Sequence, residues 1–149
     1  MYTPHTVTIY NATTDPVTIS IAYNITVIEG VFLDVSKAAN VQKTGLGDAD
    51  SATLYIPFNV TARDGTTGAI KAYKPPKEYR ALSDKSGYWT IEPGGKDSSI
   101  GCFFVKGRAV SDAGYKYLRE NFDHVYDVTT VDIRDFGSAD MQHWQVGGR

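Results

Sequence analysis

Residues 5–10 of the chain read HTVTIY, in which polar and apolar side chains alternate from Thr6 to Ile9. A period of two is typical of a β-strand that has one face in a core and the other in solvent. Residues 11–16 contain Asn, Asp, Thr and Pro, which together predict a turn. Residues 17–27 return to β-branched and aromatic side chains, so we expect them to pair with the first strand as a hairpin.

The same strand pattern recurs along most of the chain. Gly30 is expected to supply a positive φ in a tight turn before the next strand. A helical turn is predicted from Pro75 to Leu82, and a short amphipathic helix from Ser111 to about Asn121. Further strands are predicted over residues 31–35, 52–60, 88–92, 101–106, 125–134 and 140–146, and a loop over residues 61–68. Because the strands follow one another directly, we expect one mainly β domain over residues 1–149, a small antiparallel β-barrel or sandwich.

Residues 36–51 interrupt the strand pattern. They include two glycines and two aspartates and show little periodicity. A segment of this length without regular structure is uncommon in a compact domain, and such segments are usually functional or mobile. We therefore predict a long, flexible, projecting loop over residues 36–51.

The chain has 149 residues, of which 42% are hydrophobic and 21% are charged, and its formal net charge is −2. This balance argues against a disordered chain, a collagen or a coiled coil. The single cysteine, Cys102, cannot form an intramolecular disulfide, which fits folding in a reducing cytoplasm. The first ten residues lack the features of a secretory signal, and no apolar run approaches the ~20 residues of a membrane helix. We therefore expect a soluble protein with no membrane contact.

Charge is unevenly distributed along the chain. Residues 1–70 carry three basic and six acidic side chains, residues 71–119 carry ten and five, and residues 120–149 carry two and six. A basic middle between acidic ends is compatible with head-to-side contacts between copies in a ring. A β domain can also scatter its charges in this way by accident.

One candidate site is a basic face in the middle of the chain, where Tyr73 and Tyr79 are interleaved with basic side chains. Basic residues with aromatics can follow a nucleic-acid backbone, and they can also line a channel through which DNA passes. A solvated surface without a ligand is the alternative interpretation. The basic residues are Lys71, Lys74, Lys77, Arg80 and Lys85.

The sequence contains no catalytic or metal-binding motif. The three histidines are far apart and no cysteine pair exists, so no zinc spacing is present. Cys102 lies in an apolar strand and is expected to be a small core side chain. Asp48 and Asp50 resemble a fragment of a calcium loop, but the glycine and the distal glutamate of that loop are missing. We expect no catalytic residue, no metal and no cofactor; an enzyme assembled from scattered Asp and His residues has no support from spacing.

The C-terminal segment, residues 136–149, is a second candidate site. It contains Met141 and Trp144, and Met and aromatic side chains are enriched at protein–protein interfaces. We predict that it docks a neighbouring subunit through Phe136, Met141, His143 and Trp144. The alternative is a last strand that packs in the core of its own chain.

The run DFGSADMQHW at residues 135–144 is the most specific feature of the sequence. It occurs together with the segments 5–10, 38–41, 44–46, 50–58, 75–82, 87–94, 105–107 and 130–135. Over nearly the whole chain these segments resemble a family of small proteins from tailed phages and prophages of Gram-positive bacteria. Such proteins are encoded among the genes of the head–tail connector. The resemblance implies a virion structural protein of the neck or tail region that is made in the host cytoplasm.

The order of the elements also resembles the head-closure, or stopper, proteins of long-tailed phages. In that family a loop between two strands projects into the central channel of a ring and helps to retain packaged DNA. Carried over by position, the resemblance implies a channel loop with its glycine-containing tip at residues 44–47. The implied loop residues are Ala39, Asn40, Val41, Gln42, Lys43, Thr44, Gly45, Leu46, Gly47, Asp48 and Asp50. The insertion at residues 71–86 and the helix at residues 111–121 depart from the general stopper pattern.

The stopper resemblance implies a homo-oligomeric ring that contacts the connector adaptor and tail proteins. Within the channel it implies contact with DNA without sequence specificity. A tail-tube protein, a tail terminator and a β-domain binding module of the tail are the alternatives from the same set of phage proteins.

Overall fold

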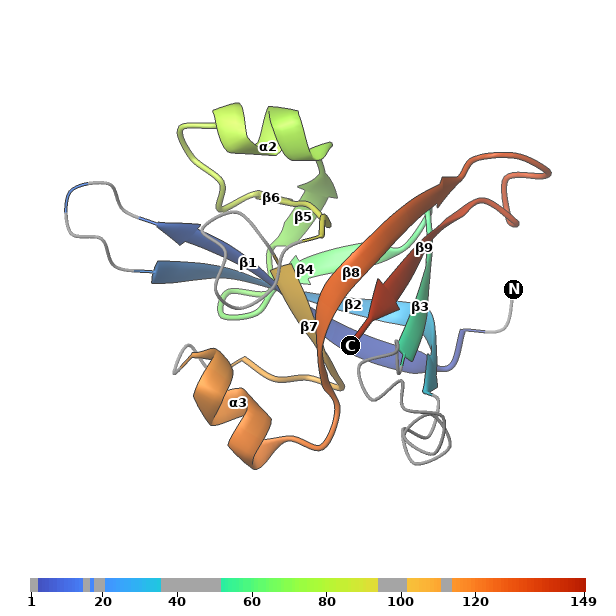
Figure 1. Ribbon diagram of the computed structural model, residues 1–149. Coiled ribbons are helices and arrows are strands. Elements are labelled where there is room, and N and C mark those ends of the chain that lie inside the picture. Colours follow the sequence, from blue (N-terminus) through green and yellow to red (C-terminus); the bar gives the residue numbers. More distant parts are fainter. Residues whose placement is uncertain (1–2, 15–16, 18–20, 36–51, 94–101, 111–113) are drawn as a thin grey trace.

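Two long strands form the spine of the fold. The computed structural model describes residues 3–14, 17, 21–35, 52–93, 102–110 and 114–149. β1 (His5–Thr14) and β2 (Ile21–Val35) pair antiparallel along the whole of β1 (Figure 1). The predicted alternation is present in β1, because Val7 and Ile9 face one hydrophobic cluster and Tyr10 faces another. The strand continues to Thr14, so the turn predicted from residue 11 begins later than expected.

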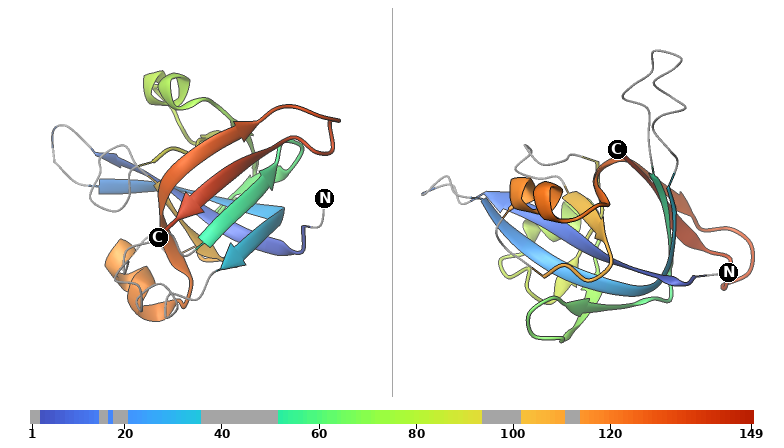
Figure 2. Two further views of the ribbon diagram at one scale, coloured as in Figure 1. Left: turned by 45° about the vertical axis from the view of Figure 1, so that its right-hand side comes forward. Right: turned by 90° about the horizontal axis from the view of Figure 1, so that it is seen from below.

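Six antiparallel strands close into a barrel. Four further strands complete it, namely β3 (Ala52–Pro57), β7 (Cys102–Lys106), β8 (Val125–Arg134) and β9 (His143–Gly148). The hydrogen-bonded order is β1-β7-β8-β9-β3-β2, and the pairing of β1 with β2 closes the circle (Figure 2). The prediction of a mainly β, antiparallel barrel is therefore confirmed.

A smaller layer branches from β2. β4 (Thr61–Asp64) pairs with β2, β5 (Ile70–Tyr73) pairs with β4, and β6 (Tyr88–Trp89) adds to β5 in parallel. α2 (Pro76–Ala81) connects β5 to β6, and α3 (Tyr115–Asn121) precedes β8. Both predicted helical segments are present. The prediction of a loop over residues 61–68 was wrong for β4, and β5 was not predicted as a strand.

Gly30 has a positive φ of 81°, but it does not lie in a turn. β2 runs unbroken through it, because β1 pairs with residues on both sides. His5 pairs with Val31 and Thr6 pairs with Glu29, so Gly30 is an extra residue in β2, which is the arrangement of a β-bulge. The free edge of β2 pairs with β4 before the bulge and with β3 after it.

The strands bury two hydrophobic clusters. The larger one fills the barrel and extends under β6, and it includes Phe104, Trp89 and Trp144. The smaller one lies between the outer side of β1 and β7 and helix α3, where Tyr10 stacks on Phe103 with ring centroids 4.7 Å apart. Neither of the two described helices is long and apolar enough to cross a membrane.

Candidate functional site

The predicted channel loop begins and ends at one rim of the barrel. Residues 36–51 lie outside the described part of the chain, and so do all eleven predicted channel-loop residues. On either side of this segment, Val35 at the end of β2 is the register partner of Ala52 at the start of β3. Ala52 is in turn the partner of Gly148 in β9. Directly paired residues lie about 5 Å apart, so the segment leaves and re-enters the barrel at neighbouring points.

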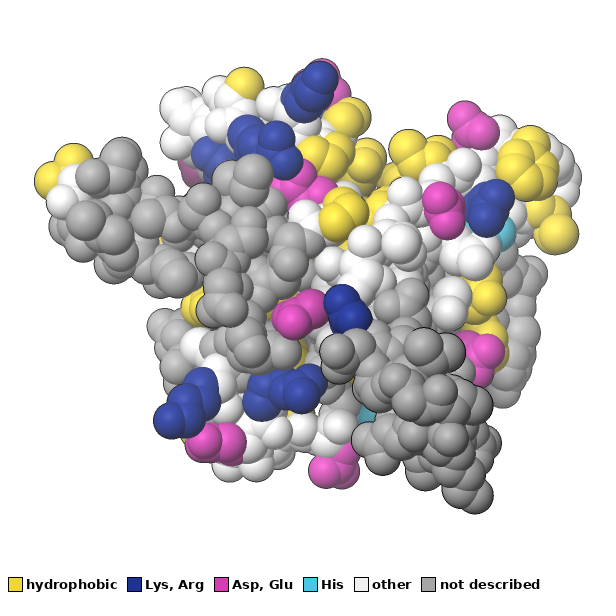
Figure 3. Space-filling view, viewed as in Figure 1, with side chains coloured by type: hydrophobic (Ala, Val, Ile, Leu, Met, Phe, Trp, Pro, Cys, Tyr) yellow, Lys and Arg dark blue, Asp and Glu magenta, His cyan; other side chains and the backbone are white. Residues whose placement is uncertain are grey.

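The loop between β8 and β9 carries two of the predicted docking residues. Phe136 is 68% exposed and Met141 is 55% exposed. Backbone and side-chain hydrogen bonds hold this loop: Met141 N donates to Ser138 O at 2.9 Å, and Ser138 Oγ donates to Asp140 Oδ1 at 2.6 Å. Hydrophobic side chains and carboxylates lie close together over this loop at the upper right of Figure 3. The loop therefore presents apolar side chains to solvent in a defined conformation.

The other two predicted docking residues belong to the barrel wall. Trp144 is only 6% exposed, and its ring packs against Phe58 and Tyr73 with centroids 4.5 Å from each. The docking prediction for Trp144 was wrong, because alternation along β9 points residue 144 inward. His143 points outward and is half-buried, and its Nδ1 lies 2.8 Å from the carbonyl oxygen of Met141.

A row of aromatic rings crosses the outside of the barrel next to this loop. His5, Phe32, Tyr55 and His143 come from β1, β2, β3 and β9, and successive ring centroids are 5.6, 5.7 and 5.7 Å apart. Sequence reasoning did not find this row, because its members are far apart in the chain and only the strand register brings them together. At its end, a hollow of about 330 Å³ separates the β9 wall from the exposed Phe136 and Met141.

Lys71 is not part of a basic face. Its side chain is 1% exposed and its ammonium group lies inside the layer formed by β2, β4 and β5. Lys71 Nζ donates to Asn24 Oδ1 at 2.6 Å, to the carbonyl oxygen of Ile25 at 3.0 Å and to Thr26 Oγ1 at 3.1 Å. It also lies 3.2 Å from Asp64 Oδ1. A buried ammonium with this many acceptors stabilises the fold and is not available to a ligand at the surface, so the basic-face prediction for Lys71 was wrong.

Asp64 and Lys71 shift each other's protonation equilibria. Burial acts to raise the pKa of Asp64, but hydrogen bonds from Thr66, Thr67 and Lys71 outweigh it and hold the pKa well below its usual value. Burial lowers the pKa of Lys71, and the Asp64 carboxylate partly offsets that effect. Through this ion pair and the hydrogen bonds of Lys71 to β2, the Asp64–Lys71 pair links β4, β5 and β2.

The remaining members of the predicted basic face lie on and beside α2. Arg80 forms an ion pair with Glu92, and Lys85 Nζ donates to the carbonyl oxygen of Leu82 at 2.8 Å. Lys74 lies over the ring of Tyr88, 5.4 Å from its centroid. Lys77 is exposed on α2. Three of these four cations thus make contacts within the chain, which weakens the case for a DNA-tracking surface.

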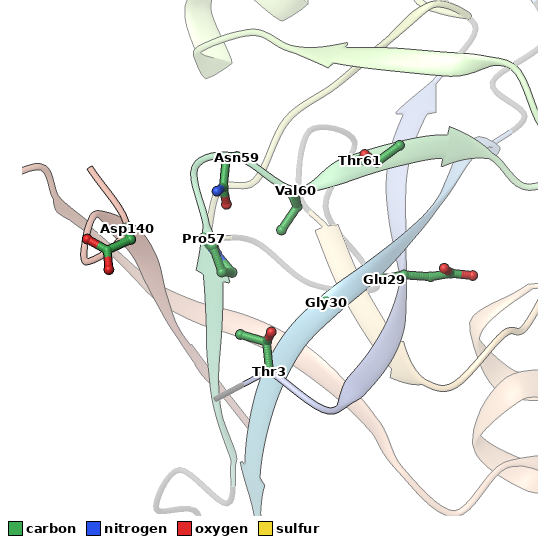
Figure 4. Close-up of a pocket in the computed structure, with 8 residues that line it drawn as sticks. All are labelled: Thr3, Glu29, Gly30, Pro57, Asn59, Val60, Thr61 and Asp140. Atoms are coloured by element: carbon green, nitrogen blue, oxygen red, sulfur yellow. The ribbon is translucent and has the colours of Figure 1, made fainter. Parts of the chain in front are cut away.

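A polar hollow of about 530 Å³ lies where the Gly30 bulge meets the connection between β3 and β4. Figure 4 shows Asp140 on one side of it and Glu29 and Thr61 on the other. The hollow is lined by Thr3, Glu29, Gly30, Pro57, Asn59, Val60, Thr61 and Asp140.

Other chemistry is limited in the described part of the chain. Cys102 is buried in β7, and burial raises the pKa of its thiol to about 12, so it is a core side chain as predicted and not a thiolate at neutral pH. Among the described residues, no group of three or more His, Cys, Asp or Glu side chains could hold a metal ion.

The chain was compared with known protein families, curated proteins and solved structures. A family described as "Family of unknown function (DUF6751)" matches residues 2–149. No curated protein and no solved structure matches the chain.

Proposed function

This chain belongs to the family of unknown function DUF6751, and we propose that it is a virion structural protein of a phage head–tail connector, a head-closure subunit that forms a ring. In this proposal the barrel is the rigid body of the subunit. The segment 36–51 is the part that faces the channel and helps to retain packaged DNA. The protein acts through its interfaces and not through catalysis.

One observation carries the proposal. β2 and β3 are hydrogen-bonded neighbours in a closed barrel, and the whole segment 36–51 is inserted between their adjoining ends, Val35 and Ala52. The barrel closes through backbone pairing that does not involve this segment. Such an insertion is free to serve a role outside the fold, which is what the resemblance to stopper proteins leads us to expect.

The exposed apolar side chains of the β8–β9 loop give additional support. Phe136 and Met141 are held outward by a hydrogen-bonded loop although β8 and β9 continue into the core. Exposed aromatic and thioether side chains next to one another are typical of protein–protein interfaces. A subunit that contacts ring neighbours, an adaptor and a tail protein requires such surfaces.

Quantitative mass spectrometry of purified virions tests the proposal. We expect the chain to be present in a few copies per virion, in a fixed ratio to the portal protein. Many copies per virion, in proportion to tail length, would identify a tail-tube protein instead. Absence from purified virions would refute a structural role.

A further inference from the structure

A second surface of the molecule combines arginines with exposed apolar side chains. Arg63 in β4 is the register partner of Val27 in β2 and of Ile70 in β5, so the three side chains lie on one face of the sheet. Arg108 lines a hollow of about 220 Å³ together with Arg63 and Val27. Val110 lies beside the end of β4, since a Cβ added at Gly65 would lie 3.2 Å from Val110 Cγ1. We call the set Arg63, Ile70, Arg108 and Val110 the arginine face.

The arginine face combines exposed apolar side chains with positive charge. Ile70 is 69% exposed and Val110 is 39% exposed. Within the described part of the chain neither arginine forms an ion pair, and Arg63 donates one hydrogen bond, to the carbonyl oxygen of Gly68 at 3.2 Å. Glu29 is the only carboxylate among the residues that line the hollow. Among the described residues that line the hollow, two guanidinium groups against one carboxylate leave a positive charge.

The β8–β9 loop has the opposite charge and a similar apolar content. Asp135 and Asp140 are exposed and flank the exposed Phe136 and Met141. Among the described residues, neither aspartate forms an ion pair, and a hydrogen bond from Ser138 keeps the pKa of Asp140 below its usual value, so it is charged at neutral pH. We call Asp135, Phe136, Asp140 and Met141 the acidic knob.

Within one subunit the two surfaces are separated by the polar hollow that has Asp140 on one side and Glu29 and Thr61 on the other (Figure 4), and no ion pair among the described residues joins them. In the right-hand view of Figure 2, β4 runs along the lower edge of the molecule and the β8–β9 loop lies at the right edge. A contact between them is therefore formed between two copies. It is a head-to-side contact, which generates a ring when its rotation closes. Arginine pairs with carboxylates through two parallel hydrogen bonds, and buried aromatic and arginine side chains dominate interface energies.

We propose that the arginine face of one subunit binds the acidic knob of a second copy of this chain. The contact would place the apolar Phe136 and Met141 against Ile70 and Val110, with carboxylates opposite Arg63 and Arg108. The inference rests on the proposed function, because that function requires a ring. The inference adds the two surfaces through which neighbouring subunits of the ring bind one another.

Self-association of four variants, followed by sedimentation velocity over a concentration series, tests this contact. The face variant carries R63E and R108E, and the knob variant carries F136S and M141S. Each is expected to self-associate roughly tenfold to a hundredfold more weakly than the wild type. The control carries K77E and K116E, which reverse two exposed cations on the helices, and it should associate like the wild type. The fourth variant, R63E/R108E/D135R/D140R, exchanges the charges of both surfaces and should regain association.

An equimolar mixture of the face and knob variants makes the test directional. Each variant keeps one intact surface, so the mixture should form a heterodimer and no larger ring. A face variant that associates like the wild type, or a wild type that stays monomeric at ~1 mM, would overturn the inference. A face variant that keeps its assembly but loses affinity for duplex DNA would make this a nucleic-acid surface and would also overturn it. The virion measurement decides the proposed function separately, so failure of the two can be told apart.

Discussion

Val35 and Ala52 are register partners in a closed barrel, although residues 36–51 separate them in the sequence. The pairing of β2 with β3 continues inward from this point through Leu33 and Leu54, both of which are buried in the barrel core. The barrel therefore holds the two ends of the segment in place by itself. What the segment does can be separated from what the barrel needs in order to fold.

Shortening the segment should leave the fold intact and remove its function. We expect a variant with residues 39–48 replaced by a short Gly-Ser linker to unfold at a temperature close to that of the wild type, because loop-closure entropy changes only slowly with length. Phage that carry this variant should assemble particles but retain less DNA. Thermal unfolding checks the first expectation, and the DNA content of purified particles checks the second. Loss of folding would show that the segment is part of the core.

Replacing two aromatic residues of the C-terminal region by alanine should have very different effects on stability. W144A should lower the free energy of unfolding by about 3–5 kcal/mol, because the buried indole packs against Phe58 and Tyr73. F136A should change the free energy of unfolding by less than about 0.5 kcal/mol, because its side chain is 68% exposed. Urea denaturation of both variants measures the difference. Equal losses would contradict the assignment of Phe136 to a docking surface.

Gly148 lies in β9 at a position where the side chains of Phe104 and Tyr126 leave no room for a Cβ. A Cβ at this position would lie 2.8 Å from Phe104 Cζ and 2.9 Å from Tyr126 Cβ. We expect G148A to cost about 1–3 kcal/mol through overpacking. G87A is the matched control, since a Cβ at Gly87 meets nothing within 4 Å. A G148A variant as stable as G87A in urea denaturation would contradict the packing of β9 between β3 and β8.

The sequence predicts those strands of the barrel that have one face in the core and the other in solvent, because their polar and apolar residues alternate. Residues 125–134 were predicted as a strand and form β8 with these bounds. The same reasoning missed β5, because its inward-facing Lys71 has the appearance of a solvent-exposed cation. Its burial is explained by acceptors in β2 and β4, which include Asn24 and Asp64. A pattern in one segment carries no information about acceptors in distant segments.

Candidate site residues were predictable only in part, for a similar reason. Phe136 and Trp144 are both aromatic residues of the predicted docking segment, and composition cannot tell which of them is buried. The register of β9 against β3 decides it, since Trp144 pairs with Ile56 on the inward side. The arginine face likewise depends on the register of β4 with β2 and β5 and has no signature in the sequence.

The Asp64–Lys71 pair should make stability depend on pH in the acid range. The pKa of Asp64 is lower in the folded protein than in the unfolded chain, so its contribution is present above about pH 4 and is lost as pH falls through the folded value. D64N should therefore be less stable than the wild type at neutral pH and approach it at about pH 2. Urea denaturation at several pH values measures this. A constant difference between the two proteins would contradict it.

Removing Lys71 tests the same pair from the other side. K71M leaves the Asp64 carboxylate without its buried cation, so we expect a loss of about 3 kcal/mol in the free energy of unfolding. The double variant D64N/K71M should lose less than the sum of the two single losses, because the pair is then removed together. Additive losses would show that the two side chains do not act on one another.

The most direct test of the central claim is the position of the protein in intact virions, determined by cryo-electron microscopy. We predict a single ring of subunits between the portal adaptor and the tail, with residues 39–50 of each subunit directed toward the lumen. Density for stacked rings along the tail, or a ring whose lumen is lined by another part of the chain, would contradict the account.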